Sequence, residues 1–187
     1  MVRRNNALNQ QLDRIFSRYP WARWPVIGLL MVLAIIGVRL DREPPRTTDL
    51  PGGEISGRAT VIDGDSLRIG GAEIRMKDID APEGRQTCRR EGRDWDCGEE
   101  ARRTLTRLIS GNTVTCRSVE RDKHSRFLGY CDAAGTELNR AMVEAGMAVA
   151  FGGFRREEQT AKAARRGLWG SEFQTPREWR HERGIGQ

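Results

Sequence analysis

The segment from residue 63 to residue 83, DGDSLRIGGAEIRMKDIDAPE, concentrates acidic side chains in an otherwise strand-like stretch. Besides Glu73, its carboxylates belong to Asp63, Asp65, Asp78, Asp80 and Glu83. A solvated, charged hairpin is one interpretation of this pattern. The other is a cation site, because Asp65 at the start of one strand and Asp80 at the end of its hairpin partner could meet at one edge of a sheet and chelate a hard cation through their oxygens.

The elements that must position these residues are predominantly strands. Five runs are strand-like: SGRATVI (56–62), SLRI (66–69), AEIRMKDI (72–79), TVTCRSVE (113–120) and RFLGYC (126–131). The second and third are joined by Gly70 and Gly71, a two-residue turn that favours positive φ. Helical spacing of apolar residues predicts helices in GEEARRTLTRLISG, ELNRAMVEAG and REEQTAKAARRGLWG. We therefore expect an α+β fold, a five-stranded OB-type Greek-key β-barrel with about three helices.

Four cysteines indicate two disulfides. None of them has the close C-x-x-C spacing of a zinc site. Cys116 and Cys131 lie on two strand-like runs around the turn DKHS, so they would face each other across a hairpin. Cys88 and Cys97 would close a short loop. Four buried thiols are the alternative. Disulfides persist only in an oxidising compartment, so this pairing predicts export.

The N-terminal region independently indicates export. Residues 25–38, PVIGLLMVLAIIGV, carry no charge and follow five arginines. This order places the N-terminus in the cytoplasm. We predict a basic cytoplasmic segment (1–23) and a single-pass transmembrane signal anchor in the inner membrane (24–39), although the run is shorter than the roughly 20 residues of a typical span. Cleavage as a signal peptide, followed by secretion, is the first alternative, and a buried core helix is the second.

Composition changes after this segment. Residues 40–53 are rich in Pro, Thr, Asp and Gly and are predicted to form a linker. A domain is expected over 54–180, followed by a polar tail at 181–187. Of the 32 Lys and Arg and 26 Asp and Glu, eight and four respectively lie in residues 1–53, so the remainder holds 24 basic and 22 acidic residues. A balance this even neither requires nor excludes a polyanion as partner.

Four motifs occur in order along the predicted domain. They are DGDS at 63–66, R-x4-D-A-P-E at 75–83, R-D-K-H-S-R at 121–126, and GLWG followed by PREWR. Together they resemble the thermonuclease, or staphylococcal-nuclease-like, family over about residues 54–180. The resemblance implies a calcium-dependent bacterial nuclease that acts on DNA or RNA and leaves 3′-phosphorylated ends, and with the export signals above we expect it to be membrane-anchored or exported and to act outside the cytoplasm. The alternatives are a catalytically silent OB module that binds nucleic acid or protein while tethered to the membrane, and an anchored structural protein of the envelope.

The resemblance also implies roles for individual acidic positions. Ca²⁺ would be held by the side chains of Asp65 and Asp80 and by the backbone carbonyl of Ala81. Glu83, three residues beyond Asp80, would orient or deprotonate the attacking water, which a carboxylate within reach of that water can do. The acidic segment would then be a cation site together with its base.

Two arginines and two aromatic residues complete the implied site. Arg75 would bind a non-bridging phosphate oxygen, and Arg126 would neutralise charge that develops on the phosphoryl group or leaving oxygen, a task suited to a planar guanidinium. Where the family carries tyrosines over the nucleotide base, this chain has Phe151 and Phe154. Phenyl rings can stack on bases, but a place in the core is an equal alternative, so base preference stays open.

Overall fold

The computed structural model describes residues 52–124 and 126–185, which all lie in one unit of the chain. The predicted cytoplasmic segment (1–23) and signal anchor (24–39), and nearly all of the linker (40–53), lie outside these residues. Within the described ranges, none of the helices combines the length and the apolar character that crossing a membrane requires.

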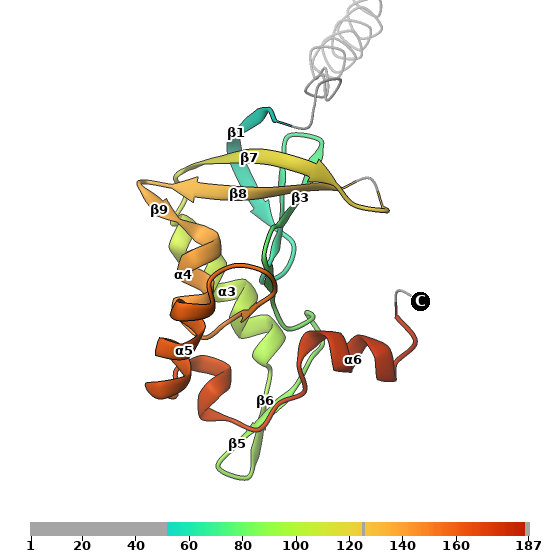
Figure 1. Ribbon diagram of the computed structural model, residues 1–187, viewed down its shortest axis with the longest axis vertical. Coiled ribbons are helices and arrows are strands. Elements are labelled where there is room, and N and C mark those ends of the chain that lie inside the picture. Colours follow the sequence, from blue (N-terminus) through green and yellow to red (C-terminus); the bar gives the residue numbers. More distant parts are fainter. Residues whose placement is uncertain (1–51, 125, 186–187) are drawn as a thin grey trace, which may run out of the picture. The chain divides into compact units, whose positions relative to one another are not determined.

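Five strands form a closed barrel (Figure 1). They are β1 (Glu54–Val61), β2 (Ser66–Ile69), β3 (Ala72–Met76), β7 (Thr113–Arg121) and β8 (Phe127–Ala133). The strands follow the order β3-β2-β1-β7-β8, and a parallel pairing of β3 with β8 joins the two ends of the sheet. A short strand, β9 (Thr136–Glu137), pairs with β8. The predicted five-stranded OB-type barrel is confirmed.

Strand alternation explains which side chains leave the core. In β3, Ala72, Ile74 and Met76 are buried, whereas Glu73 and Arg75 between them are half-buried. Successive side chains of a strand point to opposite faces, so Arg75 lies on the face away from the apolar core. The hairpin that carries the acidic segment therefore presents a guanidinium on its outer side.

The third predicted strand is shorter than expected. It was expected to run from 72 to 79, but β3 ends at Met76, and a separate strand, β4 (Ile79–Asp80), pairs with β10 (Val149–Ala150). The reason is Asp78, whose φ of 64° is left-handed and interrupts the extended chain. Asp80 is thus not at the end of the β2 hairpin partner, as predicted, but on a two-residue strand in a different sheet.

Four α-helices, rather than about three, occur in the part of the chain that the structure describes. They are α3 (Cys97–Ile109), α4 (Leu138–Glu144), α5 (Arg155–Ala163) and α6 (Pro176–Glu182), with a 3₁₀ turn, η2 (Gly167–Gly170), before the last. In Figure 1, α3, α4 and α5 lie together below the barrel and α6 stands apart from them. Leu105 of α3 and Leu138 and Met142 of α4 are buried in the same core as Leu67 and Ile74 of the barrel.

Helix α6 was not predicted, although its start carries a recognisable signal. Thr175 and Glu178 form a capping box, in which the Thr175 side chain accepts from the Glu178 amide while the Glu178 carboxylate accepts from the Thr175 amide. Pro176 occupies the first helical position, where its missing N–H costs nothing. The helix extends to Glu182, so the predicted boundary between the domain (54–180) and the polar tail (181–187) falls inside it.

Both predicted disulfides are present. Cys116 and Cys131 are directly opposite each other in the β7–β8 pairing, and their side chains are buried in the barrel. Cys88 and Cys97 connect β5 (Cys88–Arg90) to the first residue of α3. Strand β5 forms a small hairpin with β6 (Arg93–Trp95), and the disulfide at its base packs on Leu168.

Candidate active site

Asp65 is fixed by four hydrogen bonds at the turn between β1 and β2. Its amide donates to Asp63 Oδ1 at 3.1 Å, and its carbonyl accepts from the Met76 amide at 2.7 Å. Its carboxylate accepts from Ser66 Oγ at 3.0 Å and from the Ala81 amide at 3.0 Å. Only 2% of the residue is exposed. The carboxylate therefore has a defined position beneath the surface, in contact with the segment that follows β4.

Gly64 of the DGDS motif permits this contact. A Cβ at this position would lie 2.7 Å from the Cβ atoms of both Ala81 and Ala101. That separation is well inside ordinary carbon–carbon contact, so a larger residue would force the turn away from α3 and from Ala81. Glycine lets three segments that are distant in sequence meet beside Asp65.

Arg75 joins the two predicted cation ligands. Its Nη2 lies 2.9 Å from Asp65 Oδ2 and 2.8 Å from Asp80 Oδ1. Because one positively charged nitrogen contacts both carboxylates, the two face a common point. Burial raises the pKa of Asp65 from 3.8 to about 8, and the charge of Arg75 acts in the opposite direction. Arg75 thus offsets part of the effect of burial, and a cation bound beside Asp65 would favour the charged carboxylate further.

A second guanidinium reaches the acids from the C-terminal helix. Arg180 donates from Nη2 to Asp80 Oδ2 at 2.8 Å, and from Nη1 to Asp80 Oδ1 at 2.9 Å and to Glu83 Oε1 at 2.8 Å. These hydrogen bonds, first of all those to Asp80, raise the pKa of Arg180. Sequence analysis missed Arg180 because PREWR was considered only as a closing motif, and the capping box is the signal that could have placed a helix there.

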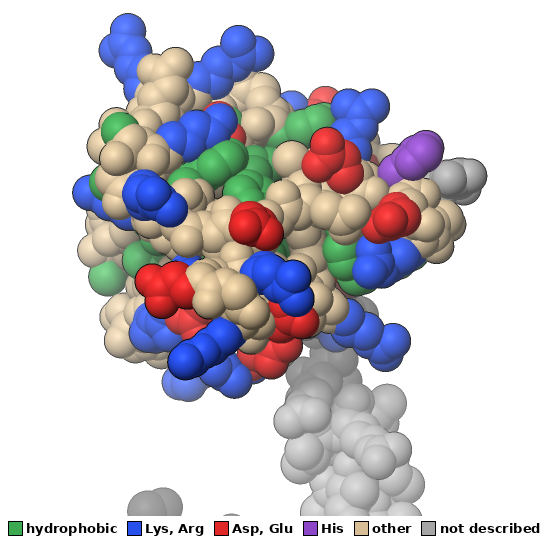
Figure 2. Space-filling view, turned by 90° about the horizontal axis from the view of Figure 1, so that it is seen from below, with side chains coloured by type: hydrophobic (Ala, Val, Ile, Leu, Met, Phe, Trp, Pro, Cys, Tyr) green, Lys and Arg blue, Asp and Glu red, His purple; other side chains and the backbone are tan. Residues whose placement is uncertain are grey.

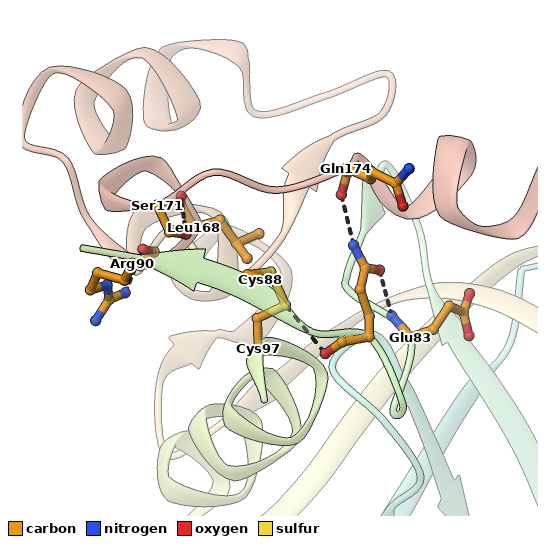
Figure 3. The surroundings of a disulfide bond; sticks show 9 residues. Glu83, Cys88, Arg90, Cys97, Leu168, Ser171 and Gln174 are labelled. Carbon is orange, nitrogen blue, oxygen red and sulfur yellow. Dashed lines mark hydrogen bonds between the residues drawn. A yellow bond between two sulfur atoms is a disulfide. The ribbon is translucent and has the colours of Figure 1, made fainter. Parts of the chain in front are cut away.

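Glu83 lies on a loop that follows β4 (Figure 3), and the side chain of Gln86 holds this loop from the inside. The Gln86 side-chain oxygen accepts from the Glu83 amide at 3.2 Å, and its Nε2 donates to the Gln174 carbonyl at 2.7 Å. Gln86 is fully buried, and its own carbonyl accepts from the Gly98 amide at 3.1 Å and lies 3.3 Å from Cys97 Sγ. The loop is therefore fixed between the start of α3 and the segment before α6.

Arg126 is held by a different carboxylate. Its Nε and Nη2 lie 2.8 and 2.7 Å from Asp122 Oδ2, and its amide donates to Asp122 Oδ1 at 3.0 Å. The amide of His124 donates to the same Oδ1 at 2.9 Å. Burial acts to raise the pKa of Asp122, but the hydrogen bonds from Arg126 and His124 outweigh it, so the pKa is lowered. Asp122 thus remains an anion that orients Arg126.

One cavity of about 740 Å³ brings most of these groups together. Its lining includes Arg75, Asp80, Glu83, Arg126 and Arg180, whereas Asp65 lies below it. The cavity is bounded by the tip of the β7–β8 hairpin on one side and by α6 on the other, which lie on the same side of the molecule (Figure 1). Three guanidinium groups therefore share one open space with the carboxylates of Asp80 and Glu83, and Asp63, Glu73 and Asp122 also line it.

The two phenylalanines predicted to stack on bases lie in different places. Phe151 is 61% exposed and lines the 740 Å³ cavity. Phe154 packs edge-on against Tyr130, with ring centroids 6.4 Å apart, and lines a separate cavity of about 450 Å³. The two rings therefore do not form one stacking platform, and Phe151 is the one that shares a cavity with the acids and arginines.

A hard cation fits the donor set beside Asp65 and Asp80. The convergence of both carboxylates on the Arg75 nitrogen marks a point that positive charge occupies, and the ligands are oxygen atoms, as Ca²⁺ prefers. Within residues 52–124 and 126–185, no cluster of three or more His, Cys, Asp or Glu forms a metal site. Further ligands would therefore come from main-chain oxygen, water or substrate. The Ala81 carbonyl as a ligand stays a prediction.

Fold and site together define a class of protein: a small closed barrel with buried carboxylates and several guanidinium groups around an open cavity, an arrangement suited to an anionic ester such as a phosphodiester. Residues 73–171, more than half of the chain, match the family model described as "Staphylococcal nuclease homologue". The chain belongs to this family, which confirms the resemblance drawn from its motifs.

Individual relatives agree with this assignment. The chain is 38% identical over 123 residues to "Succinoglycan biosynthesis protein ExoI" of Rhizobium meliloti (strain 1021), a match that covers 62% of this chain and 64% of that protein, less than two thirds of it. It is 31% identical over 143 residues to an "Uncharacterized endonuclease" of Escherichia coli O157:H7, covering 70% and 88%. It is 34% identical over 118 residues to "Probable staphylococcal-like nuclease CAN3" of Oryza sativa subsp. japonica, covering 58% and 28%. The family and the names of the second and third relatives support a nuclease, that is, a phosphodiesterase.

Proposed function

We propose that this protein is a calcium-dependent nuclease that hydrolyses phosphodiester bonds of DNA or RNA and leaves 3′-phosphorylated ends. The observation that carries the proposal is the single cavity in which Asp80 and Glu83 lie beside Arg75 and Arg126, with the buried Asp65 beneath them. Hydrolysis of a phosphodiester adds negative charge to a group that is already anionic, so it requires several positive charges around one phosphorus atom.

The side chains divide this task. Ca²⁺, held by Asp65, Asp80 and the Ala81 carbonyl, would supply additional positive charge beside the phosphate. Glu83 orients a water molecule or accepts its proton, and the water oxygen forms a bond to phosphorus as the bond to the 5′ oxygen breaks. Arg75 donates to a non-bridging oxygen, and Arg126 donates to the oxygens on which charge develops. The products are a 3′-phosphate and a 5′-hydroxyl.

Phe151 is the candidate contact for a nucleotide base. Its ring is exposed beside the phosphate-binding groups, and stacking on a base contributes about 1–3 kcal/mol. A phenyl ring offers no hydrogen bond, so stacking alone does not distinguish DNA from RNA.

We further propose that the domain acts outside the cytoplasm, on the periplasmic or extracellular side of the inner membrane. The support is the uncharged run of residues 25–38 behind a basic segment, together with two disulfides, which persist in an oxidising compartment. Cell fractionation of the full chain, with mass determination of its N-terminus, tests this. Recovery in the membrane fraction with an intact N-terminus supports the anchor, and a shortened chain in the medium or periplasm supports cleavage.

Digestion by the full chain tests the activity. Supercoiled plasmid and a single-stranded RNA are incubated with Ca²⁺, with Mg²⁺, or with a chelator, and the ends of the products are analysed for 3′-phosphate. We expect cleavage with Ca²⁺ and none with the chelator, and loss of cleavage in Glu83→Gln. Binding of either nucleic acid without cleavage under all three conditions would instead identify a catalytically silent binding module.

A further inference from the structure

Arg180 reaches the candidate site from outside the region that matches the family model. The match ends at residue 171, whereas Arg180 lies on α6, the last helix in the described part of the chain. Its partners Asp80 and Glu83 precede it by 100 and 97 residues. The C-terminal segment thus contributes a charged group to a cavity that is also lined by residues of the barrel, of β4 and of the loop after it, and by Phe151.

The position of α6 is fixed independently of Arg180. The segment before the helix is joined to the Glu83 loop by the hydrogen bond from Gln86 Nε2 to the Gln174 carbonyl at 2.7 Å. Pro176 is buried, and so is Trp179, the residue immediately before Arg180. The capping box at Thr175 fixes the start of the helix. Helix α6 is therefore docked on the loop at its first turn, and Arg180 extends from a supported backbone.

The guanidinium of Arg180 donates hydrogen bonds to two carboxylates at once. Nη1 donates to both Asp80 Oδ1 and Glu83 Oε1, so both of its hydrogens are used, and Nη2 donates to Asp80 Oδ2. The Arg180 side chain is 25% exposed, whereas that of Asp80 is 5% exposed. A planar fork that bridges two carboxylates fixes the distance and angle between them.

We propose that Arg180 is a positioning residue that ties the cation ligand Asp80 to the base Glu83. This inference rests on the proposed nuclease function, because it assigns Arg180 a role through those two carboxylates. It differs from phosphate binding: both hydrogens of Nη1 and one of Nη2 are already directed at acids rather than into the cavity. Lysine in its place keeps the charge but lacks the fork that contacts both carboxylates, so the conservative variant separates position from charge.

The test compares Arg180→Lys with the matched control Arg177→Lys in the full chain. Arg177 lies on the same helix, is exposed, and makes no ion pair within the described residues. Initial rates on a fluorescent single-stranded oligonucleotide give kcat and KM, calorimetry without substrate gives the Ca²⁺ affinity, and thermal melts report folding. We expect kcat of Arg180→Lys to fall at least about tenfold, with KM and the Ca²⁺ Kd within about threefold of wild type. Arg177→Lys should match wild type.

Two kinetic outcomes overturn the proposal. Wild-type kcat in Arg180→Lys means that bridging is not needed, and a raised KM with unchanged kcat means that Arg180 binds substrate.

A measurement without catalysis separates this inference from the proposed function. The melting temperatures of Arg180→Lys, Glu83→Ala and the double variant form a cycle. If Arg180 ties the loop in place, the two losses are clearly less than additive, because each change breaks the same contact. If the wild-type protein cleaves no nucleic acid with any cation, the proposed function fails. The cycle still decides whether Arg180 holds the Glu83 loop in place. Additive losses overturn it.

Discussion

At the scale of single residues, the acidic side chains of residues 63–83 have different roles because they have different neighbours. Asp65 and Asp80 converge on Arg75, whereas Asp78 accepts a hydrogen bond from the Tyr130 hydroxyl at 2.5 Å. Burial and this bond raise the pKa of Tyr130 to about 12. Glu73 pairs with the exposed Arg68 at 3.4 Å. Each of these side chains is a carboxylate, and its neighbours decided its role.

Glu83→Gln isolates the proposed base. Glutamine keeps the size of the side chain but cannot accept a proton from water, so kcat should fall by about 10²–10⁴-fold. Because Asp65 and Asp80 are untouched, Ca²⁺ and nucleotide affinities measured by calorimetry should stay close to wild type. Glu73→Gln, which changes another carboxylate lining the same cavity, is the control and should retain activity. Undiminished turnover in Glu83→Gln would remove Glu83 from the mechanism.

Asp122→Asn tests how Arg126 is held, through pH. The folded pKa of Asp122 is lowered below 3.8, so its contribution to stability is present above about pH 4 and is lost as pH falls through the folded pKa. Melting temperatures of wild type and Asp122→Asn should therefore differ at neutral pH and converge in acid. A difference that is constant with pH would show that charge on Asp122 is not what holds Arg126.

At the scale of elements, the loop that carries Glu83 packs closely between α3 and the segment before α6. A Cβ on Gly98 would lie 1.8 Å from the Glu83 carbonyl oxygen, which leaves no room for any side chain. The same loop ends at Cys88, whose disulfide to Cys97 connects it to α3 (Figure 3). Backbone, disulfide and Gln86 therefore all fix the position of Glu83.

Gly98→Ala should displace the Glu83 loop. We expect a lower melting temperature and a strong loss of kcat, because the clash involves backbone that cannot rotate away. Gly84→Ala is the matched control: it adjoins Glu83, but its added Cβ meets nothing within 4 Å. If both variants behave alike in thermal melts and in initial-rate assays, close packing on α3 is not what positions the loop.

Replacing each disulfide by serines separates stability from positioning. Loops of this size contribute about 3 kcal/mol to the free energy of unfolding, so both the Cys88→Ser/Cys97→Ser and the Cys116→Ser/Cys131→Ser variants should melt several degrees lower. At 25 °C the first should also lose kcat, because it releases the Glu83 loop. The second, inside the barrel, should keep kcat near wild type as long as it is folded. Equal effects on kcat would contradict this division.

At the scale of the whole molecule, the basic and acidic residues that follow residue 53 are nearly balanced in number. Figure 2 shows acidic and basic side chains interspersed on one face, with hydrophobic side chains between them. Residues 54–187 carry 24 basic and 22 acidic residues. Attraction of a nucleic acid would therefore come from the arginines of the cavity rather than from net charge, and affinity should fall moderately, not steeply, with salt.

Ca²⁺ should stabilise the folded protein as a whole. A ligand at 100 times its Kd adds about 2.7 kcal/mol to the free energy of unfolding, so the melting temperature should rise with Ca²⁺ and fall on chelation. Asp65→Asn should remove this dependence, because it neutralises a carboxylate that faces the cation position. A melt that is indifferent to Ca²⁺ in the wild type would favour a structural protein of the envelope.

The sequence by itself determined the barrel, the two disulfides and the acidic segment. Each depends on short-range patterns: alternation along strands, a glycine turn between β2 and β3, and cysteines placed symmetrically about the β7–β8 turn. The resemblance carried by its motifs also marked Arg75 and Arg126. These signals are local, so they survive without knowledge of how the segments pack.

Only the tertiary structure decided which groups share the site. Arg180 meets carboxylates 97 and 100 residues earlier in the chain, and Phe154 turns to a different cavity from Phe151. Asp80 lies on its own short strand because Asp78 adopts a left-handed conformation that is held by Tyr130 and Phe151. Contacts of this kind arise from the packing of distant segments, and no local pattern of residue types specifies the partner.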